Sequence, residues 1–80
     1  MIELDARDLP APEPFQLGLS ALMRLKKGEV IHLRHRMVPM LLIPRLKGYF
    51  YTIVEEDEVD LYICHKDDED AICEIRETLR

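Results

Sequence analysis

The chain has no tryptophan, only two cysteines and no long apolar run. Its longest apolar stretch, residues 40–43, is far shorter than the roughly 20 residues that a membrane-spanning helix needs, so we expect no contact with a membrane. The chain does not open on a basic segment followed by an apolar one, which predicts no secretory signal. Cys64 and Cys73 do not make a disulfide scaffold of the secreted type, so we expect a cytoplasmic protein with reduced thiols.

Spacings typical of metal ligands are missing as well. The sequence contains no Cys-x-x-Cys pair and no His-x-x-x-His pair on a helix. His32 and His35 lie an odd number of residues apart on a predicted strand, so their side chains should point to opposite faces. Cys64 and His65 are separated in the same way, which leaves the imidazole poorly placed to activate the thiol. We therefore expect no metal and no bound cofactor.

Charge is distributed unevenly along the 80 residues, whose formal net charge is −5. Residues 1–23 carry a net charge of −3, residues 24–47 carry +6 and residues 48–80 carry −8. Such a pattern can mark a basic binding face or an acidic tail. Because the cations fall mainly at predicted helix ends and strand faces, we interpret them chiefly as a solvated surface.

The spacing of apolar residues along the chain predicts its helices and strands. Alternating apolar and polar residues indicate strands, and apolar residues three or four apart indicate helices. The stripe of the main helix consists of Phe15, Leu19, Leu22 and Met23, and Lys26-Lys27-Gly28 ends it. A second, shorter helix should lie between Pro39 and Gly48, kinked or delayed by Pro44. The expected strands are residues 2–5, 30–36, 49–54 and 59–64, and the expected main helix is residues 14–26.

The order of these elements predicts an α/β two-layer sandwich, β-α-β-α-β-β, with a mixed four-stranded sheet and both helices on one face. The first strands should be parallel, and the last two should form an antiparallel hairpin across the acidic residues 55–58. Residues 1–66 then form the domain, and residues 67–80 an acidic helical tail with Ile72, Ile75 and Leu79 on a narrow stripe. The uncovered sheet face should carry Glu3, Asp5, His32, Arg34, Arg36, Asp60, Tyr62 and Cys64.

Residues 4–14 read Leu-Asp-Ala-Arg-Asp-Leu-Pro-Ala-Pro-Glu-Pro. This stretch resembles the opening of the TusA/SirA-like sulfur-carrier family, Leu-Asp-x-Arg-Gly-Leu-x-Cys-Pro-x-Pro. The likeness extends over about residues 2–66 through the Gly28-Glu29 turn and Gly48. The chain is most similar to the family branch classed as a domain of unknown function, which lacks the motif cysteine and begins its second helix with a pattern seen here as Pro39 and Leu42.

The resemblance implies both a scaffold and a missing group. In the carriers the motif cysteine accepts sulfane sulfur as a persulfide, helped by the neighbouring helix N-terminus. Here Ala11 stands at that position and Asp8 replaces the family's glycine. This substitution weighs against an enzymatic role without deciding the matter. The motif loop, which we expect to bind a partner, comprises Arg7, Ala11, Pro12, Glu13 and Pro14.

Three functions follow as expectations. The first is a non-catalytic protein-interaction module, acting as a monomer or weak dimer, whose partner is a sulfur or redox protein. The second is sulfur carriage through Cys64 in place of the missing cysteine. The third is RNA binding by the open sheet face through His32, Arg34 and Arg36, with Tyr62 stacking on a base, although the acidic net charge argues against nucleic acid.

Overall fold

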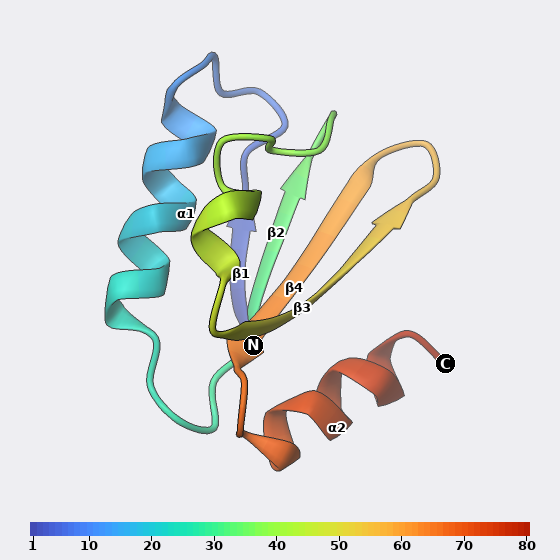
Figure 1. The fold of residues 1–80 in the computed structure, drawn as a ribbon. Helices are drawn as coiled ribbons and strands as arrows, with labels where there is room; N and C mark the ends of the chain where they lie inside the picture. Colours follow the sequence, from blue (N-terminus) through green and yellow to red (C-terminus); the bar gives the residue numbers. More distant parts are fainter.

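The structure is a computed structural model that describes all of residues 1–80, and Figure 1 shows its ribbon. None of its helices has the length and apolar character that crossing a bilayer would require. Along the chain the elements are strand β1 (Ile2–Asp5), helix α1 (Glu13–Arg24), strand β2 (Ile31–His35), the 3₁₀-helix η1 (Ile43–Leu46), strand β3 (Tyr49–Glu55), strand β4 (Val59–His65) and helix α2 (Glu69–Thr78).

The four strands form one mixed sheet in the order β1-β2-β4-β3. β1 and β2 are parallel, whereas β4 is antiparallel to both of its neighbours. Leu4 lies opposite Leu33, and Leu33 lies opposite Leu61, so apolar side chains form a row across the sheet. The predicted α/β sandwich with a mixed four-stranded sheet is confirmed.

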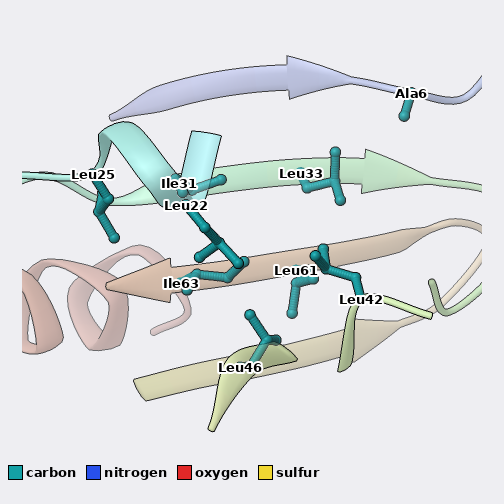
Figure 2. Close-up of a cluster of buried hydrophobic side chains, with 9 residues drawn as sticks. All are labelled: Ala6, Leu22, Leu25, Ile31, Leu33, Leu42, Leu46, Leu61 and Ile63. Atoms are coloured by element: carbon teal, nitrogen blue, oxygen red, sulfur yellow. The ribbon is translucent and has the colours of Figure 1, made fainter. Parts of the chain in front are cut away.

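One face of the sheet packs against α1 and η1. Leu22 and Leu25 reach the sheet from the end of α1, and Leu42 and Leu46 reach it from η1 and the residue before it. Burial of these aliphatic side chains is the main favourable contribution to folding. Figure 2 shows the nine side chains of this main core, which are Ala6, Leu22, Leu25, Ile31, Leu33, Leu42, Leu46, Leu61 and Ile63.

Two helical predictions need correction. Met23 is 81% exposed, so the stripe of α1 does not include it, and Gly18 is buried instead. A Cβ on Gly18 would lie 2.7 Å from a methyl carbon of Leu42, so the glycine lets the residues before η1 approach α1 closely. The second helix is only a single 3₁₀-turn that begins at Ile43, because Pro39 and Pro44 leave too few consecutive N–H donors for an α-helix.

The opposite face is not open along its whole length. Ala71 and Ile75 of α2 pack against the sheet, and Figure 1 shows α1 and α2 on opposite sides of it. The carboxylate of Asp68 caps α2 by accepting hydrogen bonds from the N–H of Ala71, at 3.2 Å, and the N–H of Gly28. The prediction that Tyr62 and Cys64 are exposed is therefore wrong. They belong to a second core made of Val30, Tyr62, Cys64, Ala71 and Ile75.

Candidate functional site

A groove of about 580 Å³ lies at the end of the sheet where the two parallel strands finish. The chain leaves β1 and β2 at this end, and Figure 1 shows the two following loops side by side there. Ligands of open α/β sheets bind preferentially outside the carboxyl ends of the strands. We call this hollow the loop groove, and it is lined by Arg7, Asp8, Leu9, Pro10, Ala11, Pro12, Pro14, Phe15, His35, Arg36, Met37, Val38, Pro39, Met40 and Leu41.

The first wall of the loop groove is the predicted motif loop. Its prolines stiffen the chain up to the first turn of α1, where Pro14 is buried. Glu13 begins α1, and the peptide bond between Ala11 and Pro12 is cis. Ala11 is exposed and lines the groove, so the chain presents a methyl group at this point of the wall.

The helix N-terminus beside the groove offers few donors. Pro12 and Pro14 have no N–H, and the N–H of Glu13 donates to the carbonyl oxygen of Pro10 at 3.0 Å. One first-turn donor therefore remains, the N–H of Phe15. Because anion binding at a helix N-terminus depends on several convergent N–H groups, this junction is poorly equipped for a phosphate or a persulfide.

The second wall, from the loop after β2, is apolar and exposed. Met37, Met40 and Leu41 are 66%, 72% and 68% exposed. Methionine side chains are flexible and polarisable, and they adapt to apolar partners of varied shape. The guanidinium of Arg45 lies 5.8 Å from the centre of the Phe15 ring, which lines the groove. The wall can therefore receive an apolar segment next to a cation.

The charged groups around the loop groove are paired with one another within the chain. Arg7 bonds Asp5 at 2.6 Å and Glu58 at 3.1 Å, and the Arg7 side chain holds the pKa of Asp5 well below its usual range. Arg36 pairs with Asp8 at 2.9 Å, which connects the two walls. These side chains are committed within the chain, so the apolar surface is what the groove offers to a ligand.

His35 supports the second wall from inside. Its Nδ1 accepts a hydrogen bond from the N–H of Arg36 at 2.7 Å and from that of Met37 at 3.3 Å. Burial lowers the pKa of His35, which keeps this nitrogen available as an acceptor. The lining contains no Ser, Thr, Cys, Tyr or Lys, and its carboxylate, that of Asp8, is paired with Arg36 at 2.9 Å.

The predicted sheet-face residues lie apart from this groove, with one exception. His32 lies between Glu3 and Asp60 at 2.7 Å from each, and its ring stacks on Tyr62 at 4.4 Å. Arg34 bonds Glu58 at 3.3 Å. Arg36 belongs to the loop groove instead. His32, Arg34 and Arg36 each have a carboxylate of this chain as a partner, which leaves little positive potential for phosphates.

Neither cysteine lies near the loop groove. Cys64 is fully buried beneath α2, and this burial raises the pKa of its thiol to about 11. Cys73 is exposed on α2. His65 points to the other face, where its Nε2 lies 2.7 Å from the carbonyl oxygen of Leu25, as the alternation of strand residues predicts.

Sequence reasoning overlooked most of the second wall. The sequence predicts Pro39 and Leu42 as parts of a second helix, and it does not identify Met37, Met40 or Leu41 as binding residues. A signal is present in the sequence, because residues 37–44, six apolar residues and two prolines, follow Arg36 with no polar residue among them. The described residues include no group of three or more His, Cys, Asp or Glu side chains placed to hold a metal ion.

Comparisons with protein-family models, with curated proteins and with solved structures found no match to this chain.

Proposed function

We propose that this chain is a small non-catalytic protein-interaction module that binds an apolar segment of a partner protein in the loop groove. The observation that carries the proposal is the exposure of Met37, Met40 and Leu41 around Ala11. Large apolar side chains that are exposed together on one surface are typical of protein interaction sites, whereas apolar side chains exposed singly are not. The resemblance of residues 4–14 to sulfur carriers suggests that the partner belongs to a sulfur or redox pathway.

The size and chemistry of the groove fit such a role. Its volume of about 580 Å³ falls within the roughly 300–1,000 Å³ that is typical of ligand sites. Because Arg7 and Arg36 are paired with carboxylates of the chain, a partner would gain affinity mainly by burying apolar surface. The cation at Arg45, beside Phe15, would favour a partner segment that carries an acidic residue next to its apolar ones.

The other two functions have weaker support. A sulfur carrier needs an accessible thiolate, whereas Cys64 is fully buried and its pKa is raised to about 11. An RNA-binding face needs unpaired cations, whereas His32 and Arg34 are paired with acidic neighbours. Binding without chemistry is therefore the function that these contacts favour.

The proposal is tested with two matched methionine variants. Met40→Glu places a charge in the loop groove, and Met23→Glu places the same charge on the exposed side of α1, outside the groove. Partners captured by the wild-type chain are identified by mass spectrometry, purified and titrated against all three chains. Burial of a methionine contributes about 1.5–3 kcal/mol, so Met40→Glu should weaken binding at least about tenfold. Met23→Glu should bind like the wild type.

Two outcomes would contradict the proposal. One is equal affinity of Met40→Glu and the wild type for every captured partner. The other is a partner that Cys64→Ala fails to bind but Met40→Glu still binds, which would show that binding depends on the thiol and not on the loop groove. Circular dichroism of each variant shows whether the chain is folded, so that loss of binding is not confused with loss of structure.

A further inference from the structure

β3 is an edge strand whose outer side has no neighbour in the sheet. The order β1-β2-β4-β3 leaves β1 and β3 at the edges, and Figure 1 shows β3 as the outermost strand on its side. β1 has four residues, of which Glu3 and Asp5 are charged. β3 has seven residues and no charge before Glu55. Charged residues therefore protect the edge of β1 against pairing with another strand, and the edge of β3 lacks this protection.

The exposed edge of β3 has a composition that favours pairing with another strand. Its first six residues are Tyr-Phe-Tyr-Thr-Ile-Val, which are all aromatic or β-branched. Its pairing with β4 continues without a bulge from Tyr49 to Glu55, and it contains no proline. Tyr51 is 39% exposed, and the other five are only half-buried. Proteins usually protect such an edge with charges, prolines or bulges, because an unprotected one recruits another strand.

Opposite charges flank the two ends of β3. Lys47 precedes the strand, Glu55 is its last residue, and Glu56 and Asp57 follow in the turn to β4. All four side chains are exposed, and none of them takes part in an ion pair within the chain. An antiparallel strand of identical sequence would bring the basic end of each copy beside the acidic end of the other. A parallel copy would set like charges against each other.

We propose that β3 pairs antiparallel with β3 of a second copy of this chain, on a two-fold axis through Thr52. Thr52 is the middle residue of the strand, so this register pairs all seven residues. Phe50 then lies opposite Val54, and Tyr51 lies opposite Ile53. Both are aromatic and β-branched pairs, which stabilise antiparallel sheets. The two four-stranded sheets become one continuous sheet, closed by two-fold symmetry.

Each copy contributes the same charge contact at the two ends of this interface. Lys47 of one copy lies beside Asp57 of the other, and the symmetry repeats the contact. Charge complementarity therefore selects a second copy as the occupant of this edge, in place of an unrelated strand. The interface uses no residue of the loop groove, so it does not depend on the proposed function.

Sedimentation equilibrium with charge-reversal variants tests the proposal. Lys47→Glu and Asp57→Lys should each raise the dimer dissociation constant about tenfold, because each changes two contacts per dimer from attractive to repulsive. The double variant Lys47→Glu/Asp57→Lys should restore the wild-type dissociation constant. Arg76→Glu, an exposed charge reversal on α2, is the control and should leave it unchanged. All these positions are exposed, so the variants should fold.

A central substitution gives an independent measurement. Thr52→Arg places two like charges face to face on the axis and should make the chain monomeric, with its circular dichroism unchanged. In the wild type, hydrogen exchange of β3 amides should slow as protein concentration rises. The proposal is overturned if the wild type is monomeric up to about 1 mM. A dimer that persists in Thr52→Arg, or single variants that the double variant does not rescue, would also overturn it.

Discussion

Ile75→Ala tests whether α2 is part of the folded core or an appendage. Ile75 is fully buried between α2 and the sheet, in the second core with Tyr62 and Cys64. Removing its outer carbons costs about 0.8 kcal/mol for each one in transfer free energy, and the remaining cavity adds to this. We expect the free energy of unfolding to fall by about 3–4 kcal/mol.

This loss is large for a chain of this size. Domains of 80 residues have a free energy of unfolding of about 4–12 kcal/mol, so the variant would lose a large fraction of it. The midpoint of thermal unfolding should fall by more than about 10 °C. Ile72→Ala is the matched control, because Ile72 is on the same helix but only partly buried. It should cost much less in the same urea and thermal unfolding measurements.

The reactivity of Cys64 reports on the same contact. With Cys73→Ser as the background, Cys64 is the single thiol, and its raised pKa of about 11 leaves roughly one thousandth of it ionised at pH 8. Labelling by a thiol reagent should therefore be slow in this background and much faster when Ile75→Ala loosens α2. Equal destabilisation by Ile75→Ala and Ile72→Ala, or labelling of Cys64 at the rate of an exposed thiol, would refute the packing of α2 on the sheet.

Two further predictions concern single contacts. The N–H groups of Gly28 and then Ala71 lower the pKa of Asp68, so its carboxylate stabilises the fold above about pH 4, and this contribution disappears as the pH falls through the lowered pKa. Between pH 7 and pH 3 the midpoint of thermal unfolding should therefore change less in Asp68→Asn than in the wild type. The exposed control Asp67→Asn should change as much as the wild type does. Identical profiles for Asp68→Asn and the wild type would contradict this. Gly18→Val should lower the free energy of unfolding by about 1–3 kcal/mol, because its side chain would collide with Leu42, whereas Ser20→Val on the exposed side of α1 should not. A Gly18→Val chain as stable as the wild type in urea would show that Leu42 can move aside.

The sheet was predictable because strand periodicity is a local property. Ile2 and Leu4, and then Ile31 and Leu33, alternate with polar residues, and one buried face follows directly from that alternation. The hairpin between β3 and β4 was predictable for the same reason, since residues 55–58 are too charged to be buried. The motif loop was also predictable, because Pro12 and Pro14 restrict the backbone wherever they occur.

The side chains whose exposure was predicted wrongly are those whose burial depends on contacts between distant parts of the chain. Met23 fits the helical spacing of the apolar residues but is exposed. The buried side of α1 instead includes Gly18, against which Leu42 packs. The sequence of β4 does indicate that its second face is partly covered, because the apolar residues Tyr62 and Cys64 stand at positions where an exposed face would be polar. Nothing local could show that residues 69–78 would return to cover them.

The sequence alone determined the strands, the main helix and a proline loop with Ala11 at its centre, because each depends on neighbouring residues. The tertiary structure decided which surfaces remain available for binding. It buried Cys64 under α2, paired His32 and Arg34 with acidic side chains, and brought Met37, Met40 and Leu41 up to Ala11. Burial and ion pairing depend on segments far apart in the chain, and only the folded arrangement brings those segments together.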